Sequence, residues 1–223
     1  MPTNDVNALR VVVLISGSGS NLQALIDGVA TGDLPIDIVA VISNRPDVMG
    51  LTRAANANIP TVVLDHKGFS SREAFDQELM RVIDTYNPGL VVLAGCMRIL
   101  TPEFTEHYLG RMLNIHPSLL PKYQGLHTHQ RAIDASETEH GVTVHFVTAE
   151  LDGGPAVVQA VVPVLPTDDA GLLAKRVQRQ EHVIYPLAVK WFAQGDLTMK
   201  EGKAVLKGET LPVCGHQIKA NEP

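Results

Sequence analysis

An amide and an imidazole side chain stand two residues apart in the stretch 112–118, which reads Met-Leu-Asn-Ile-His-Pro-Ser. Because side chains alternate along a strand, Asn114 and His116 are predicted to point to the same face. Pro117 disfavours a helix at His116 and keeps that residue extended. Hydrogen-bond donors held at the end of a strand can stabilise negative charge on a reacting carbonyl oxygen. A turn with a structural histidine would explain this segment equally well.

A second candidate is the turn at 16–21, Ser-Gly-Ser-Gly-Ser-Asn, between an apolar stretch and a helical pattern. Such a turn offers free N–H groups and the positive end of a helix dipole to an anion. A dinucleotide fingerprint would need glycine at Leu22 and an acidic residue after the stretch 36–43, which instead runs into Asn44 and Arg45. No GxxxxGK[ST] loop occurs either. A single phosphate is therefore the favoured ligand, and a simple tight turn is the alternative.

The other reactive residue types favour structural roles. His127 and His129 have no further metal ligand at a suitable spacing, so we predict no metal site. Cys96 follows an apolar stretch and is predicted to be a packed thiol. No GxSxG elbow occurs, and Asp152 stands in an Asp-Gly-Gly turn, where turn formation is the ordinary role. Acyl transfer to a substrate amine needs no protein nucleophile, only an oxyanion stabiliser, a proton donor and a proton acceptor.

The elements that would position these residues alternate along the first half of the chain. Short apolar, β-branched stretches predict strands at 10–15, 36–43, 61–64, 90–94 and 111–116. Helical spacing predicts helices after Ser20, which would form a capping box with Gln23, and at 50–58, at 71–86 and from Pro102. This order predicts an α/β fold with a mostly parallel central sheet and helices on both faces. Ligands bind at the carboxyl ends of such strands, where 17–21, 95–100 and 114–118 lie.

The second half predicts an antiparallel part. A helix is expected at 125–136, and strands at 141–147 and 156–164 are close enough in sequence to pair antiparallel, with Thr143 and His145 on one face. Asp168 or Thr167 should cap a long last helix that Pro186 kinks. Small strands are expected at 196–212, around the turns at 201–202 and 207–208, and the last few residues should be loose. We predict one domain over 1–223, with a core at about 10–195 and a small C-terminal part at 196–223.

Composition narrows the class of protein. The chain has 223 residues, of which 45% are hydrophobic and 19% charged, so it can bury a sizeable core. A net charge of -6 and a pI near 5.8 argue against a nucleic-acid surface. Two cysteines without a CxxC motif, and no apparent signal peptide or membrane span, predict a cytoplasmic protein without membrane partners. Residues 1–9 and 212–223 carry no functional motif, and the sequence leaves monomer and homodimer open.

Six motifs together resemble one enzyme family, the phosphoribosylglycinamide (glycinamide ribonucleotide, GAR) formyltransferases of purine biosynthesis. They occur in order, without evident gaps, between about residue 10 and residue 195. The motifs are Val-Leu-Ile-Ser-Gly-Ser-Gly-Ser-Asn-Leu-Gln-Ala at 13–24, Leu-Ala-Gly-Cys-Met-Arg-Ile-Leu at 93–100, Leu-Asn-Ile-His-Pro-Ser-Leu-Leu-Pro-Lys-Tyr at 113–123, His-Gly-Val-Thr-Val-His-Phe-Val at 140–147, Leu-Asp-Gly-Gly-Pro at 151–155 and Gln-Glu-His-Val-Ile-Tyr-Pro at 180–186.

The resemblance implies a formyltransferase-type Rossmann-like domain and a set of site residues. The implied catalytic trio is Asn114, His116 and Asp152, with Thr143 and His145 as possible supports for a water. The residues implied to bind GAR are Gly19, Ser20, Asn21, Gln178, Arg179, Gln180 and Glu181. The residues implied to bind the donor, 10-formyltetrahydrofolate, are Arg72, Met97, Arg98, Ile99, Leu100, Asn114, Thr148, Ala149, Glu150, Leu151 and Asp152. No metal is implied, and the partners are these two small molecules.

The implied reaction is attack of the GAR amine on the formyl carbon, with negative charge developing on the formyl oxygen. Asn114 and a protonated His116 would donate hydrogen bonds to that oxygen, and Asp152 would favour the imidazolium. Two positions depart from the family pattern, Gln124 in Lys-Tyr-x-Gly and Ala149, where an acidic residue can occur. A formyltetrahydrofolate deformylase, an initiator-tRNA formyltransferase and a silent sugar-phosphate-binding module are the competing hypotheses. The first would carry an N-terminal regulatory module, and the second a basic C-terminal domain.

Overall fold

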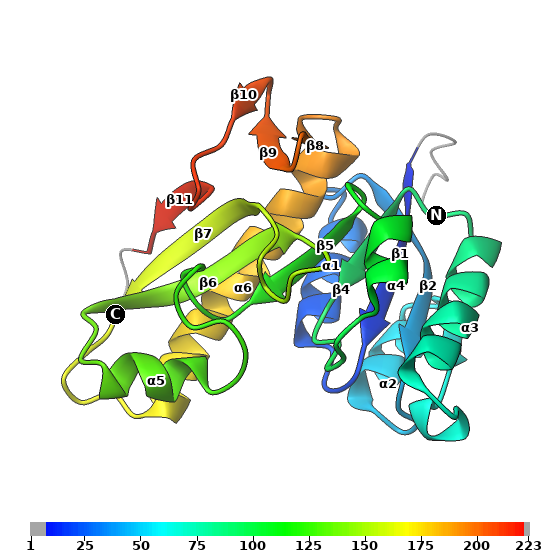
Figure 1. Ribbon diagram of the computed structural model, residues 1–223, viewed down its shortest axis with the longest axis horizontal. Coiled ribbons are helices and arrows are strands. Elements are labelled where there is room, and N and C mark those ends of the chain that lie inside the picture. Colours follow the sequence, from blue (N-terminus) through cyan, green and yellow to red (C-terminus); the bar gives the residue numbers. More distant parts are fainter. Residues whose placement is uncertain (1–7, 221–223) are drawn as a thin grey trace.

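A computed structural model describes residues 8–220 of the chain (Figure 1). The strands are β1 (Leu9–Ile15), β2 (Ile36–Ser43), β3 (Thr61–Val63), β4 (Leu90–Leu93), β5 (Met112–His116), β6 (Glu139–Phe146), β7 (Ala156–Pro163), β8 (Leu197–Lys200), β9 (Lys203–Leu206), β10 (Glu209–Thr210) and β11 (His216–Lys219). The helices are α1 (Ser20–Ala30), α2 (Met49–Asn56), the short 3-10 helix η1 (His66–Gly68), α3 (Arg72–Thr85), α4 (Pro102–His107), α5 (Thr128–Asp134) and α6 (Ala170–Ala193).

The main sheet has the order β11-β7-β6-β5-β4-β1-β2-β3. The pairs from β3 to β5 are parallel, whereas β6 runs antiparallel to both β5 and β7. The chain moves outward from β1 to β3 and then crosses to β4 on the other side of β1. The carboxyl ends of β1 and β4 therefore form the switch point where open α/β sheets bind ligands. The predicted α/β fold class, mostly parallel with an antiparallel part, is confirmed.

Alternation along the buried strands builds two cores. In β1, Val11, Val13 and Ile15 join the core that α1, α2 and α6 cover, while Val12 and Leu14 join the core under α3 and α4 (Figure 1). All five side chains are at most 2% exposed, which explains a stretch without polar interruptions. The sheet thus holds the strand ends rigidly between two helical layers.

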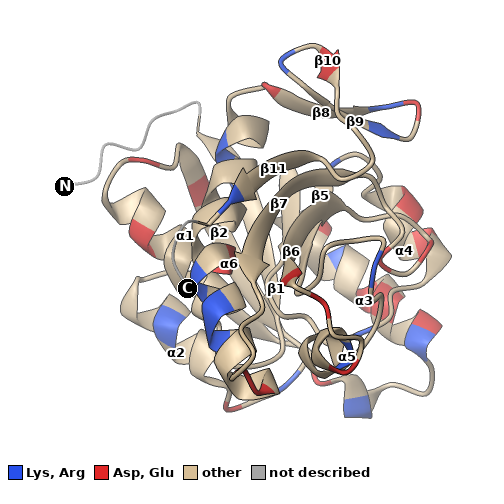
Figure 2. Ribbon diagram, turned by 90° about the vertical axis from the view of Figure 1, so that its left-hand side faces the viewer, with Lys and Arg blue, Asp and Glu red and all other residues tan. Residues whose placement is uncertain are grey.

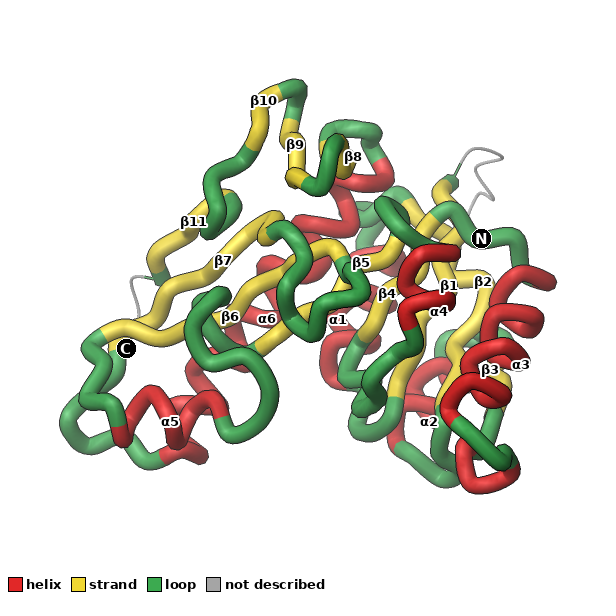
Figure 3. Tube along the Cα trace, in the orientation of Figure 1, coloured by secondary structure: helices red, strands yellow, loops and turns green. Residues whose placement is uncertain are grey.

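The antiparallel part is built differently. One face of β6 and β7 packs on α6, and the loop at 117–127 covers the other face (Figures 1 and 3). That face carries the buried polar side chains of Thr143, His145 and Gln159. A loop can satisfy such groups with its backbone: Leu120 donates from its amide to Thr143 and accepts at its carbonyl from Gln159. Polar side chains are therefore retained inside the sheet next to the end of β5.

Two predicted caps are wrong. The capping box of Ser20 and Gln23 does not form: Gly19 is the N-cap of α1 in a left-handed conformation, and the Gln23 side chain donates to Asp27. The last helix is capped by Asp169, whose side chain accepts from Leu172, and not by Asp168 or Thr167. Asp168 instead forms an ion pair with Arg176 of α6. Because the ion pair occupies the carboxylate of Asp168, the next residue, Asp169, caps the helix.

Other boundaries also differ from the sequence prediction. The helix expected at 125–136 is limited to Thr128–Asp134, because residues 125 and 127 have positive φ values of 79° and 58°. The three-stranded sheet β8-β9-β10 confirms the small strands at 196–212. The strand β11, which pairs with β7, was not predicted, and the last few residues, expected to be loose, include 221–223, which lie outside the described residues. Residues 1–7 and 221–223, with the lack of function expected there, lie outside the described residues.

The main sheet includes strands from β1, which begins at residue 9, to β11, which ends at residue 219. This agrees with a single domain, and the division into domains stays a prediction. The helix α6 continues through Pro186 without interruption. Within residues 8–220, no helix is both long and apolar enough to cross a membrane.

The Tyr185 side chain links α6 to the strands β4 and β5. Its buried hydroxyl lies 2.7 Å from the carbonyl oxygen of Leu93 and 3.0 Å from that of Leu113. Burial raises the pKa of this phenol well above its ordinary value, so the hydroxyl keeps its proton and donates. The contact lies one residue before Asn114.

We expect Tyr185→Phe to lower the free energy of unfolding by about 1–2 kcal/mol, because two buried carbonyl oxygens lose their donor. Urea unfolding followed by circular dichroism measures this change. The matched control is Tyr86→Phe on the half-buried Tyr86, which should change the midpoint little. Equal midpoints for Tyr185→Phe and the unmodified protein would contradict this role.

Candidate active site

The two polar residues of β5 share one face of the sheet, as predicted. In the pairing of β5 with β6, Asn114 stands opposite His145 and His116 stands opposite Thr143. Residues directly opposite each other in such a pair point to the same face. The four side chains therefore form one polar patch at the end of β5.

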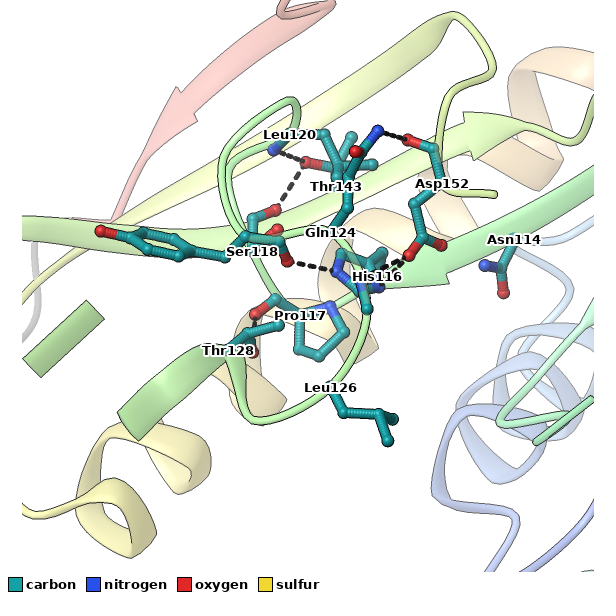
Figure 4. A network of polar contacts seen from close by, with 12 residues as sticks. Asn114, His116, Pro117, Ser118, Leu120, Gln124, Leu126, Thr128, Thr143 and Asp152 are labelled. Atoms are coloured by element: carbon teal, nitrogen blue, oxygen red, sulfur yellow. Dashed lines mark hydrogen bonds and ion pairs between the residues drawn. The ribbon is translucent and has the colours of Figure 1, made fainter. Parts of the chain in front are cut away.

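His116 faces Asp152 in a nearly dry environment (Figure 4). Its Nδ1 lies 3.5 Å from the Asp152 Oδ2, and the two side chains are only 9% and 8% exposed. The other nitrogen, Nε2, donates to the backbone carbonyl of Tyr123 at 2.9 Å. Because a carbonyl only accepts, Nε2 must carry a proton. The nitrogen without a backbone partner is therefore Nδ1, beside the carboxylate.

Asp152 reaches this position from the connection between β6 and β7. Val147 pairs with Met112 at the start of β5, so the connection folds back over the sheet to bring Asp152 to the far end. Asp152 adopts a φ of 50°, a left-handed conformation that costs free energy in a residue with a side chain. The Gly125 amide donates to its Oδ2 at 2.9 Å, which helps to hold it there.

Asn114 is oriented by a neutral histidine. The Nδ1 of His145 lies 2.9 Å from the Phe146 carbonyl and must donate to it, which leaves Nε2 as an acceptor. The Asn114 Nδ2 lies 3.3 Å from that Nε2 and can donate one of its two hydrogens. Burial lowers the pKa of His145, which keeps this ring neutral. The second hydrogen of Asn114 remains for a ligand.

Thr143 has a different role from the expected support of a water. Its hydroxyl donates to the Ser118 carbonyl at 2.7 Å and accepts from the Leu120 amide and the Gln159 side chain, both at 3.1 Å. The side chain is fully buried. These three contacts occupy the hydroxyl and hold the loop that follows His116 in place (Figure 4).

The glycine-rich turn meets the last helix. Gly19 has a φ of 70°, and a Cβ atom there would lie 2.6 Å from the Gly50 Cα, so only glycine fits. Asn21 donates to Glu181 at 2.9 Å, and Gln178 donates to Ser20 at 3.3 Å. Burial raises the pKa of Glu181. The turn and one face of α6 thus form a continuous polar surface.

Two further residues of α6, Arg179 and Gln180, do not contact the turn through a side-chain hydrogen bond within residues 8–220. Arg179 is exposed and Gln180 half-buried. Basic residues do occur on α6 and α2 (Figure 2). Arg53 of α2 donates to the Ser18 carbonyl at 2.8 Å, which brings a positive charge beside the turn. The surroundings of the turn therefore suit an anion.

The residues implied to bind the donor lie on two irregular segments and one helix. The segments 97–100 and 148–152 border the same core, in which Val147, Cys96 and Leu100 pack. Three side chains on them are exposed apolar groups, Met97 at 67%, Ile99 at 58% and Leu151 at 52%. Arg98 and Thr148 are half-buried, Ala149 and Glu150 are exposed, and Arg72 is exposed at the start of α3.

Cys96, His127 and His129 are the other reactive residue types that the sequence assigned to structural roles. Burial raises the pKa of the Cys96 thiol to about 11, which disfavours a thiolate nucleophile. His129 lies 3.1 Å from His140, Nδ1 to Nε2, while His127 is exposed. Among residues 8–220 no group of three or more His, Cys, Asp or Glu is arranged to hold a metal ion.

Sequence reasoning missed the backbone groups that orient the pair of His116 and Asp152. These are the Tyr123 carbonyl and the Gly125 amide. The Tyr-Gln-Gly sequence signals a turn with positive φ, and Tyr123 has a φ of 55° and Gly125 of 79°. Nothing in the sequence indicates which side chains such a turn would bind. Gln124, a departure from the family pattern, donates to the Asp152 carbonyl at 3.3 Å.

Two histidines lie next to this loop. The buried His140 ring packs edge-to-face against Tyr123, with 6.3 Å between the ring centroids, and its Nε2 lies 3.1 Å from the Nδ1 of the half-buried His129. Burial is the main cause that lowers the pKa of His140 to about 4, with the charge on His129 acting in the same direction. Both rings are therefore neutral near pH 7.

Three comparisons with known proteins bear on this site. The formyl transferase family matches residues 9–189. The chain is 55% identical to the phosphoribosylglycinamide formyltransferase of Escherichia coli, over 93% of this chain and 98% of that protein. It is 49% identical to the enzyme of the same name from Haemophilus influenzae, over 96% and 99%. A solved structure of the Coxiella burnetii phosphoribosylglycinamide formyltransferase with CHES has a TM-score of 0.91 and 52% identity, over 94% and 99% of the two chains.

Because the pKa of buried His140 is low, we expect the free energy of unfolding to fall in acid. An unfolded histidine takes up a proton near pH 6.5, whereas folded His140 does so only near pH 4. Between pH 6.5 and pH 4 the unfolded state binds more protons than the folded state. The free energy of unfolding therefore falls by about 2–3 kcal/mol as the pH is lowered through this range. The stability difference between the unmodified protein and His140→Gln, from urea unfolding at pH 7, 5.5 and 4, should shrink accordingly. The exposed His216→Gln is the control, and a pH-independent difference for His140→Gln would refute the assignment.

Proposed function

The chain belongs to the formyl transferase family, and we propose that it transfers the formyl group of 10-formyltetrahydrofolate to the amine of glycinamide ribonucleotide (GAR). The products are formylglycinamide ribonucleotide and tetrahydrofolate, which places the reaction in purine biosynthesis. The relatives that carry this name match over nearly their whole length. The proposed catalytic groups are Asn114, His116 and Asp152.

The observation that carries the catalytic assignment is the buried pair of His116 and Asp152 beside an oriented amide. Its side chains are 9% and 8% exposed, and water screens charges weakly in such surroundings. Asn114 stands two residues before His116 on the same face and has one N–H to spare. Two donors and one carboxylate are the groups that amine acylation requires.

In the proposed reaction, the neutral amine of GAR attacks the formyl carbon and forms a tetrahedral intermediate. Negative charge collects on the former carbonyl oxygen, where the Asn114 Nδ2–H and the protonated His116 Nδ1–H donate hydrogen bonds. The carboxylate of Asp152 stabilises the imidazolium from 3.5 Å. The amine loses one proton, through a water held by Asp152, and the folate nitrogen gains one as the carbon–nitrogen bond breaks.

The binding residues follow from the same assignment. The backbone of Gly19, Ser20 and Asn21 would bind the GAR phosphate, and Gln178 to Glu181 its ribosyl glycinamide part. Support comes from the hydrogen bonds that join Asn21 to Glu181 and Ser20 to Gln178. Arg72 and the segments 97–100 and 148–152 would hold the donor, and the exposed Met97, Ile99 and Leu151 would contact its aromatic part.

Two broader expectations stay part of the proposal. The reaction needs no metal ion, because the three side chains supply every charge and proton that it uses. A cytoplasmic location agrees with the two free thiols, Cys96 and Cys214.

The first test separates formyl transfer from hydrolysis. Purified protein is mixed with 10-formyltetrahydrofolate, and tetrahydrofolate release is followed by absorbance with and without GAR. We expect turnover only when GAR is present. Turnover without GAR would indicate a deformylase, and folate binding without turnover would indicate a silent binding module. Either result would overturn the proposal.

The second test concerns the three catalytic groups. His116→Ala, Asp152→Asn and Asn114→Ala should each lower kcat by about 100- to 1000-fold, with a smaller effect on the KM for GAR. The control is Asp134→Asn on the exposed face of α5, which should keep kcat within about twofold. An unchanged kcat in the His116 or Asp152 variant would remove that residue from the mechanism.

A further inference from the structure

The segment at 94–101 joins β4 to α4 without a helix or strand of its own. It presents Met97 and Ile99, which are 67% and 58% exposed, on the side proposed to hold the donor. The Ala94 amide donates to the Leu14 carbonyl of β1 at 2.9 Å, but residues 95–100 belong to no helix or strand whose backbone hydrogen bonds would hold them. Its shape must therefore come from contacts with neighbouring elements.

One contact fastens the beginning of the segment. The Met97 amide donates to the Ser16 hydroxyl at 2.9 Å. Ser16 is 3% exposed at the end of β1, and its own proton goes to the Asn44 side chain at 2.6 Å. This end of the segment is tied to the carboxyl ends of β1 and β2.

A buried carboxylate fastens the other end. The Thr101 amide donates to the Asp76 Oδ2 at 2.7 Å, and Asp76, on α3, is fully buried. Its second oxygen, Oδ1, has no hydrogen-bond partner among the described residues. A carboxylate in that position costs free energy that an apolar residue would not. Next to Asp76 along α3, the ring of Phe75 carries the Arg98 guanidinium at 4.1 Å from its centroid.

We propose that Asp76 is a positioning residue for donor binding. It holds the amide of Thr101 so that the segment 97–100, fixed by Ser16 at its other end, keeps the shape that fits the folate. Asp76 itself touches neither substrate. This inference rests on the proposed function, which assigns 97–100 to the donor, and extends it to a residue behind the site.

The test compares Asp76→Ala with Asp76→Asn, which keeps an acceptor oxygen but loses the charge. Asp76→Ala should raise the KM for 10-formyltetrahydrofolate and the Kd for tetrahydrofolate about tenfold, with the KM for GAR within twofold. Asp76→Asn should recover most of the loss, to about threefold. Deuterium exchange of the peptide that contains 97–101 should be faster in the alanine variant, a sign of a released segment.

The matched control is Asp84→Asn on the same helix. Asp84 joins α3 to α4 through Tyr108 and His107 and leaves the segment 94–101 untouched. It should alter thermal stability without changing the KM ratio of the two substrates. If Asp76→Ala fails to fold, Ser16→Ala tests the other end and should also raise the Kd for tetrahydrofolate selectively.

The outcomes separate this inference from the proposed function. Equal loss of affinity for both substrates, or lower stability with an unchanged Kd for tetrahydrofolate, would overturn the positioning role. If the unmodified protein lacked GAR-dependent turnover, the proposed function would fail, while the tetrahydrofolate and deuterium-exchange measurements would still decide whether Asp76 holds the segment.

Discussion

The structure depends on keeping a histidine and an aspartate together where water is almost excluded. Burying such a pair costs free energy unless further hydrogen bonds satisfy the remaining groups. One loop supplies them: the Tyr123 carbonyl accepts from His116, and the Gly125 amide donates to Asp152. His116 ends β5 and Asp152 lies in the connection between β6 and β7, and the loop is the element that both contact. The geometry of the site is thus a property of the loop at 117–127 as much as of β5.

The antiparallel part of the sheet makes room for that loop. In the parallel part, helices cover both faces, and the buried side chains of β1 and β4 are all apolar. Beyond β5 the loop replaces a helix on one face, and Thr143 and Gln159 bind its backbone. Each contact satisfies a buried polar group and at the same time fixes a backbone position near His116. Stability and orientation of the site therefore come from the same hydrogen bonds.

The proposed substrate sites use the other strand ends. The turn after β1 holds α1 close to α2 through the close approach of Gly19 and Gly50. The segment after β4 is irregular, but Ser16 and Asp76 hold its two ends from behind. Irregular backbone supported at both ends can present exposed apolar side chains to a flat aromatic ligand without collapsing on itself. In the proposed function, the three strand ends would provide a phosphate turn, a catalytic pair and a donor surface along one edge.

The sequence by itself determined the α/β class, the parallel strands and the placing of Asn114 and His116 on one face, because local periodicity decides which side chains are buried. It also marked the turn at 19–21. Only the tertiary structure decided that Asp152 meets His116, that Asp169 and not Asp168 caps α6, and that Asp76 holds Thr101. These contacts join residues whose side chains have several possible partners, and the choice among them depends on packing between distant elements. Backbone partners such as the Tyr123 carbonyl leave no mark in the sequence, since every residue has one.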